Sequence, residues 1–254
     1  MSQEENGGDA ILSFVKQLQG EGCGTRTVEV RVSDKDFAEY IKKNMSWCEP
    51  VKVRHAKLPE LVTVQFDNVA FHGHPDGNEL LALLGSIWDS TQDTNLAESV
   101  VGYASAAGYE VALPSLAKCS SDKCIDLTSF PDKVAILTTS TCGYCPYAVM
   151  ALASLSRLGG FALEVYNVST SREMAEEAEK VYRAFASIAG EEYTSTPTTI
   201  IIWGDKKDVV IGSPANLLSS IMFFMSKLGA VRDYKRLAAD VLDVLNSQTP
   251  TRDG

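Results

Sequence analysis

The sequence predicts an α/β protein made of two consecutive copies of one strand–helix unit. Three observations lead to this prediction. In residues 133–229, short apolar runs of strand length alternate with longer segments in which apolar side chains recur every three or four positions, as in helices. Residues 9–87 follow nearly the same order of strands and helices. In each half a proline, Pro59 in the first and Pro197 in the second, stands directly before a pair of strands.

The first unit is predicted over residues 8–92. Its expected elements, in order, are a helix at 9–18, a strand at 27–32, a helix at 34–44, strands at 51–55, 61–66 and 69–72, and a helix from 75 through 87. Too few residues separate the strand at 51–55 from Pro59 to form another helix. We therefore expect the first unit to be a trimmed copy of the second.

The second unit is predicted over residues 93–230 and has the clearer patterns. Its expected elements are helices at 93–107, 145–158, 170–188 and from Ser213-Pro214 to about 229, and strands at 133–139, 161–168, 199–203 and 208–211. Residues 108–132 have mixed character. Residues 231–254 form a C-terminal segment, in which we expect an amphipathic helix at 231–245 and disorder from residue 246 onward.

Composition excludes some classes of partner. The formal net charge is -10, which argues against binding to nucleic acid or to an anionic membrane, because both require a basic surface. The acidic residues 1–8 lack the basic-then-apolar order of a signal peptide, and no apolar run reaches the length of a membrane span. We expect a soluble cytoplasmic protein.

The residues with the clearest chemistry are Cys142-Gly143-Tyr144-Cys145-Pro146, between the strand at 133–139 and the helix at 145–158. A thiolate at the start of a helix is stabilised by unsatisfied backbone N–H groups and by the helix dipole. Such a thiolate attacks a disulfide to form a mixed disulfide, and a second thiol one turn further on can release it. The motif therefore predicts a dithiol that exchanges with other disulfides.

A Cys-x-x-Cys pair at a strand-to-helix turn resembles the redox motif of the thioredoxin superfamily. More narrowly, residues 140–149 and the junction at 89–96 resemble the glutaredoxin-like protein disulfide oxidoreductases of thermophilic archaea and bacteria, which have two fused thioredoxin-like units. The resemblance extends over residues 9–229. It implies tandem thioredoxin-like units, a protein disulfide oxidoreductase activity, and no cofactor besides the redox-active disulfide.

The resemblance also implies roles for individual residues. Cys142 is the expected nucleophile and Cys145 the resolving thiol, with Gly143, Tyr144 and Pro146 supporting the site. Pro197 is expected to be a cis-proline that faces the disulfide, and the backbone of Thr196 to pair with an extended substrate chain. The implied partners are protein disulfide or dithiol substrates and a flavin-dependent thioredoxin reductase.

The sequence departs from the family pattern in three places. Ser33-Asp34-Lys35-Asp36 stand where the first unit often has its own Cys-x-x-Cys, so we expect a redox-inactive copy that shapes a docking surface. Ile136 occupies the position, six residues before Cys142, where many thioredoxins have a buried acid. The proton acceptor for Cys145 is thereby unassigned. The insertion around Cys119 and Cys124 is not part of the family pattern.

The other four cysteines leave alternatives open. Cys119 and Cys124 are favoured as a structural disulfide, over a second exchange pair that relays electrons to Cys142 and over free thiols. Cys23 and Cys48 are candidates for another disulfide or for buried thiols. Zinc held by two cysteine pairs is the alternative to redox chemistry. We expect no metal site at the histidines, which are His55, His72 and His74.

Two further functions stay in competition with a general protein disulfide oxidoreductase. One is a dedicated electron donor to a peroxiredoxin, because the paired-unit modules of alkyl hydroperoxide systems also combine a thiol-less first unit with an active second one. The other is a non-catalytic scaffold or chaperone whose cysteines bind zinc.

Overall fold

The computed structural model describes residues 28–32, 51–55, 62–66, 68–73, 96–113, 119, 121–128, 130–139, 141–168, 175–192 and 194–248. The three helices predicted in the first unit lie outside these residues. So do Cys23, Cys48, His74 and the Ser33–Asp36 stretch. Within the described part of the chain, no helix is both long enough and apolar enough to cross a membrane.

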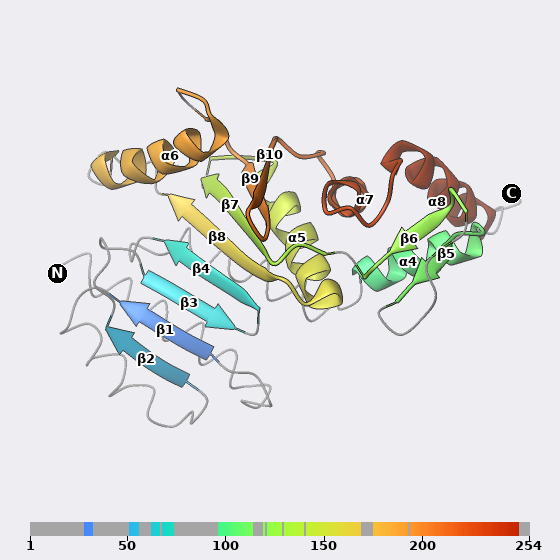
Figure 1. Ribbon diagram of the computed structural model, residues 1–254, viewed down its shortest axis with the longest axis horizontal. Helices are drawn as coiled ribbons and strands as arrows, with labels where there is room; N and C mark the ends of the chain where they lie inside the picture. The colour runs from blue at the N-terminus through green and yellow to red at the C-terminus, as the bar shows by residue number, and fades with distance from the viewer. Residues whose placement is uncertain are drawn as a thin grey trace, which may run out of the picture.

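Eight strands of the described chain form one mixed sheet (Figure 1). They are β1 (Val28–Val32), β2 (Val51–His55), β3 (Val62–Phe66), β4 (Val69–Gly73), β7 (Lys133–Thr139), β8 (Ala162–Val168), β9 (Thr198–Trp203) and β10 (Lys206–Ile211). The strands lie in the order β10-β9-β7-β8-β4-β3-β1-β2. All of them fall at or within about a residue or two of the strands that the sequence predicts.

The order and direction of strands repeat within this sheet. In the quartet β10-β9-β7-β8, β7 is parallel to β8 and antiparallel to β9, which is antiparallel to β10. In the quartet β4-β3-β1-β2, β1 is parallel to β2 and antiparallel to β3, which is antiparallel to β4. Parallel pairing of β4 with β8 joins the two. This repeat favours the two predicted units, whose boundaries at 92/93 and 230/231 stay predictions.

Helices cover both faces of the β7–β10 quartet. They are α5 (Cys145–Gly159) and α7 (Leu217–Lys227) on one face and α6 (Ala175–Ala189) on the other. The helices α4 (Leu96–Ala106) and α8 (Tyr234–Gln248) pack against α7, and α4 also packs against α5. Side chains alternate along β7: Val134 and Ile136 pack in the larger core with residues of α5 and α7, whereas Ala135 and Leu137 pack in the smaller core with residues of α6. The succession β7-α5-β8-α6-β9-β10-α7 is the α/β arrangement expected of a thioredoxin-like unit.

The predicted end of α5 at Gly159-Gly160 is confirmed, and each glycine has a physical reason. Gly160 has φ 73°, a left-handed conformation that closes the helix, and its N–H donates to the carbonyl of Ser156 at 2.7 Å. At Gly159 an added Cβ would collide with the ring of Phe130. The C-terminal end of α5 therefore packs against the segment that leads into β7.

Two expectations need correction, and a stretch without a predicted element receives one. The helix α7 begins at Leu217 with Asn216 as its cap, whose side chain accepts the N–H of Ser219, and not at Ser213-Pro214. The helix α8 continues to Gln248, so the disorder predicted from residue 246 is wrong for 246–248. The stretch of mixed character at 108–132 contains two parallel strands, β5 (Glu110–Ala112) and β6 (Cys124–Asp126), which are too short to produce a period.

Candidate redox site

Cys142 and Cys145 form a disulfide at the turn between β7 and α5, with their Cα atoms 5.4 Å apart. Cys145 is the first residue of α5 and is only 1% exposed, whereas Cys142 is partly exposed. A partner disulfide or thiol would therefore reach the sulfur of Cys142 and not that of Cys145. This asymmetry is what the predicted roles of nucleophile and resolving thiol require.

The start of α5 directs one backbone N–H, that of Cys145, toward the partly exposed sulfur of Cys142. The N–H of Cys145 lies 3.2 Å from Cys142 Sγ and also 3.2 Å from the Cys142 carbonyl. The capping residue Tyr144 offers no side-chain hydrogen bond, and Pro146 occupies the first turn, where a missing N–H costs nothing. The polar environment of Cys142 Sγ is thus supplied by the helix end, which favours a thiolate.

Hydrogen bonds connect the segment before β9 to its neighbours. The Thr196–Pro197 peptide bond is cis, and Pro197 is buried with its carbonyl accepting the N–H of Gly212 at 2.8 Å. The hydroxyls of Thr194 and Thr198 lie 2.6 Å apart, and the hydroxyl of Thr198 also donates to the carbonyl of Ser195. The predicted contact of this segment with a substrate chain stays a prediction.

Thr139, the last residue of β7, joins this segment to the cysteine turn. Its Oγ1 lies 3.2 Å from Thr196 Oγ1, and its carbonyl accepts the N–H of Cys142 at 3.2 Å. Sequence reasoning missed Thr139. The signal in the sequence was slight: a pair of hydroxyl residues, Thr138-Thr139, that ends an otherwise apolar strand.

Exposed apolar side chains lie on the cysteine turn, on the first turn of α5 and at the end of β10. Tyr144, between the two cysteines, is 53% exposed, and Tyr147 on the first turn of α5 is 37% exposed. Ile211 is 53% exposed and pairs with Thr198, one residue from Pro197. Gly143 is exposed too, and an added Cβ there would meet no atom within 4 Å. Tyr144 and Tyr147 therefore present exposed aromatic side chains in the turn and the first helical turn that hold the two cysteines.

No carboxylate is among the buried side chains of the residues that the structure describes. Ile136 is buried, and it pairs with Thr199 of β9. The buried polar residues of the described chain are all neutral: Thr138, Thr139, Ser156, Asn167, Thr194, Thr198, Thr199 and Ser220. The position that often holds an acid in thioredoxins is therefore filled by a packed aliphatic side chain.

Cys119 and Cys124 form a second disulfide, with Cα atoms 5.8 Å apart, so the favoured bridge is present. Figure 1 places β5 and β6 beside α4 and α8 at one end of the molecule, and β7 runs away from that end toward Thr139. The bridge therefore lies apart from the Cys142 turn, which does not favour an electron relay between the two pairs within one chain.

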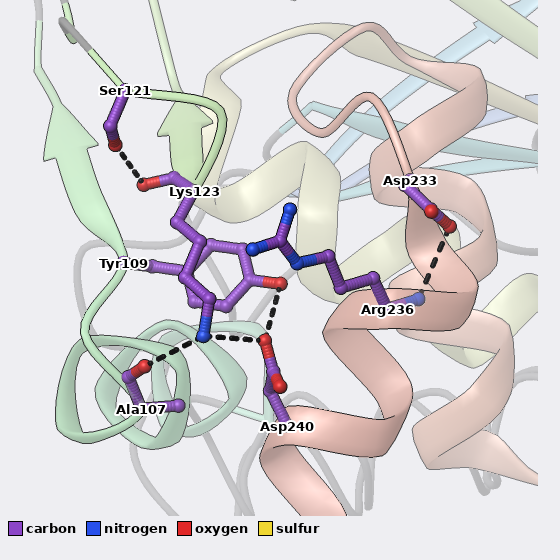
Figure 2. A network of polar contacts seen from close by, with 7 residues as sticks. All are labelled: Ala107, Tyr109, Ser121, Lys123, Asp233, Arg236 and Asp240. Atoms are coloured by element: carbon purple, nitrogen blue, oxygen red, sulfur yellow. Dashed lines mark hydrogen bonds and ion pairs between the residues drawn. The ribbon is translucent and has the colours of Figure 1, made fainter.

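The bridged loop is anchored to α8 by a polar network (Figure 2). Lys123 Nζ lies 2.9 Å from Asp240 Oδ2 and donates to the carbonyl of Ala107, and the hydroxyl of Tyr109 donates to the same Asp240 oxygen at 3.0 Å. Burial, followed by the hydrogen bond to Asp240, raises the pKa of Tyr109 to about 12. The bond to Lys123 lowers the pKa of Asp240. These contacts indicate a structural role for the loop.

Metal ligands do not gather in the described part of the chain: no three side chains of His, Cys, Asp and Glu come together there. His72, on β4, instead stacks on the ring of Tyr166 on β8, with ring centroids 4.4 Å apart. Tyr166 in turn donates to Glu164, which pairs with Lys133 at 2.6 Å. These side chains connect the two strand quartets where β4 meets β8.

Comparison with known proteins finds no matching family model and no matching curated protein. Three solved structures are similar. A protein of Sulfolobus solfataricus is 17% identical with a TM-score of 0.41, covering 77% of this chain and 96% of that one. The alkylhydroperoxide reductase AhpF of Enterococcus faecalis is 17% identical with a TM-score of 0.39, covering 85% and 97%. A protein disulfide oxidoreductase of Aeropyrum pernix is 15% identical with a TM-score of 0.41, covering 92% and 97%.

At these identities and TM-scores, the likeness adds no argument of its own. The α/β fold rests on the strand order of the sheet and on the helices that cover it. The site rests on the disulfide between a partly exposed Cys142 and a buried Cys145 at the start of α5.

Proposed function

We propose that the protein catalyses thiol–disulfide exchange on other proteins through Cys142 and Cys145. The observation that carries the proposal is the asymmetry of the pair: one sulfur is accessible and bonded to a helix N–H, and the other is buried directly beside it. The start of a helix stabilises the thiolate of an accessible cysteine. A purely structural disulfide needs neither an accessible sulfur nor a stabilised thiolate.

The reaction proceeds through two exchanges of sulfur bonds. In the reduced protein, the thiolate of Cys142 attacks a substrate disulfide, forms a mixed disulfide and releases one substrate thiolate. Cys145 then attacks Cys142 Sγ, the Cys142–Cys145 bond forms, and the second substrate sulfur leaves with the electron pair. Two electrons pass from the dithiol to the substrate, whose sulfurs take up the two protons. Oxidation of a substrate dithiol runs these steps in reverse.

The neighbouring residues have supporting roles in this proposal. Tyr144, Tyr147 and Ile211 contact apolar side chains of a polypeptide, and the backbone of Thr196 pairs with its extended chain. The direction of electron flow follows the reduction potential, for which about 30 mV corresponds to about 1.4 kcal/mol. A flavin-dependent thioredoxin reductase is the proposed source of electrons when the protein acts as a reductant.

The test is turnover of insulin with dithiothreitol as the reductant. Wild-type protein should accelerate reduction, and Cys142→Ser should abolish the acceleration. Cys145→Ser should accumulate a mixed disulfide through Cys142, identified by peptide mapping. Trapping through Cys145 in the Cys142→Ser variant would reverse the assigned roles, and no acceleration by the wild type would refute the proposal.

A dedicated electron donor to a peroxiredoxin is the second candidate. The observation that favours it is the sequence Ser33-Asp34-Lys35-Asp36, which leaves the first unit without a Cys-x-x-Cys motif of its own. Turnover on a peroxiredoxin, measured beside turnover on insulin, separates the two, because a dedicated donor should be poor on insulin. One tightly held zinc per freshly purified chain, with no turnover on either, would favour the non-catalytic scaffold instead.

A further inference from the structure

One buried hydroxyl group in the described chain makes no hydrogen bond. Thr199, the second residue of β9, is 0% exposed, and its Oγ1 has no partner among the described residues. Buried polar groups are nearly always hydrogen-bonded, because an unpaired one loses its bonds to water without replacement. A buried hydroxyl that has no partner in the oxidised protein is available to a partner that appears only in another state of the protein.

The register of the sheet gives the side of the sheet on which Thr199 lies. Thr199 is directly opposite Ile136 of β7, and residues opposite each other share a face. Ile136 belongs to the larger core with Ala148 and Leu152 of α5. The next residue along β9, Ile200, belongs to the smaller core with α6. Thr199 therefore lies on the face that α5 covers, two residues after Pro197.

Cys145 begins α5 above this same face and is almost completely buried. In the disulfide, its sulfur carries neither a proton nor a charge. On reduction it becomes a thiol that must lose its proton to attack the mixed disulfide, and apolar surroundings disfavour the resulting thiolate. Ile136 offers no polar atom, and no buried residue of the described chain is charged. Among the described residues, the one unpaired buried hydroxyl is that of Thr199, and it lies on this face.

We propose that Thr199 is a positioning residue for the resolving step: its hydroxyl donates a hydrogen bond to Cys145 Sγ once the opened disulfide lets that side chain rotate. A bond to the charged form favours the thiolate. Cys145 Sγ then forms its bond to Cys142 Sγ, the bond from Cys142 to the substrate breaks, and the substrate sulfur leaves with the electron pair. The proton that Cys145 releases to solvent is balanced by the one that the substrate sulfur takes up.

This inference rests on the proposed function, and it is tested on one step of that function. Reduced protein is mixed with 5,5′-dithiobis(2-nitrobenzoate) under single-turnover conditions. The first thionitrobenzoate is released when Cys142 forms the mixed disulfide, and the second when Cys145 resolves it. The rates of both releases are measured as a function of pH for the wild type, Thr199→Val and Thr199→Ser.

Thr199→Val should slow the second release by about tenfold and move its pH profile upward, because a hydrogen bond to a charged group is lost. The first release should stay unchanged, and Thr199→Ser should retain both rates within about twofold because it keeps the donor. Thr138→Val is the matched control: it removes a buried hydroxyl that already lies 3.2 Å from the Tyr166 carbonyl, and it should not slow the second release selectively.

Equal rates of second release in wild type and Thr199→Val would overturn the inference, and so would equal slowing of both releases. Both outcomes would leave the proposed function intact, because the wild type would still complete the two releases. A wild-type protein that never gives the second release would instead refute the proposed function itself. Val has nearly the shape of Thr and removes only an unpaired polar group, so the variant is expected to fold.

Discussion

Thr139 and Thr196 share a hydrogen bond, 3.2 Å between their Oγ1 atoms, that connects the end of β7 to the cis-proline segment. Because the carbonyl of Thr139 also accepts the N–H of Cys142, one residue fixes both the turn that bears the accessible sulfur and the segment before Pro197. These two segments are more than fifty residues apart in the sequence. The bond sets the relative position of a sulfur and of a backbone that, in the proposed function, both contact the same substrate.

Thr139→Val should therefore impair substrate reduction more than folding. Loss of one neutral hydrogen bond is worth about 0.5–1.5 kcal/mol, so we expect kcat/KM for insulin to fall by about two- to tenfold. The reactivity of Cys142 toward a small disulfide should change less, because a small reagent does not need the Thr196 backbone. Thr139→Ser should restore the activity on insulin. Equal activity of the Val variant and the wild type on insulin would show that the bond does not position the site.

The free energy of unfolding should respond in opposite directions to the loss of two buried hydroxyls. In the oxidised protein Thr199→Val removes a buried hydroxyl that has no partner, so we expect stability to rise by about 1 kcal/mol. Thr138→Val removes one that lies 3.1 Å from Asn167 Oδ1, so we expect stability to fall by about 1 kcal/mol. Urea unfolding of both variants without reductant measures the difference. A loss of stability in Thr199→Val would mean that this hydroxyl is bonded in the oxidised state.

The sequence predicts the second unit closely because its signals are local. Three signals determine structure only within a few residues: the apolar run of β7, the two glycines at the end of α5 and the Cys-x-x-Cys motif. The structure places β7 and the end of α5 where these signals predict them. The pairing of Cys119 with Cys124 is favoured for the same reason, since only four residues separate them.

What the sequence does not reveal depends on contacts between distant segments. The bond from Thr139 to Thr196, and the register that sets Thr199 opposite Ile136, exist only once β7 and β9 have paired. The strands β5 and β6 are three residues long and gain their stability from neighbours: the N–H of Asp126, for example, donates to the carbonyl of Ala230. A pattern in three residues is too short to distinguish a strand from a loop.

The stability of the protein should decrease at high pH through Tyr109. Its pKa is raised to about 12 in the folded protein, mainly by burial and then by its bond to Asp240, against 10.0 for the ordinary group. The folded state thus holds the phenolic proton more tightly than the unfolded state, and this contribution is complete below pH 10 and is lost as pH rises from about 10 to about 12. Other groups also titrate in this pH range, and their effect on the unfolding free energy cancels when the wild type is compared with Tyr109→Phe.

The difference in unfolding free energy between these two proteins should therefore shrink from about pH 9 to about pH 11.5, with the wild type losing more. The Phe variant also lacks the bond to Asp240, so it should be the less stable of the two at neutral pH. A difference that stays constant over this pH range would mean that Tyr109 titrates alike in the folded and unfolded chains.

Removal of the second disulfide, Cys119–Cys124, should lower the unfolding free energy and leave the turnover of insulin nearly unchanged. The bridge closes a loop with a sequence separation of 5, for which the chain-entropy relation gives about 2 kcal/mol. The double variant Cys119→Ala/Cys124→Ala should lose about that much unfolding free energy, and the contact of Lys123 with Asp240 should weaken with it, because the bridge shapes the loop that presents Lys123.

Insulin turnover should stay within about twofold of the wild type at a temperature where both are folded, because the bridge stands apart from the Cys142 turn. A large loss of turnover in the folded variant would instead show that electrons pass through Cys119 and Cys124 on their way to Cys142.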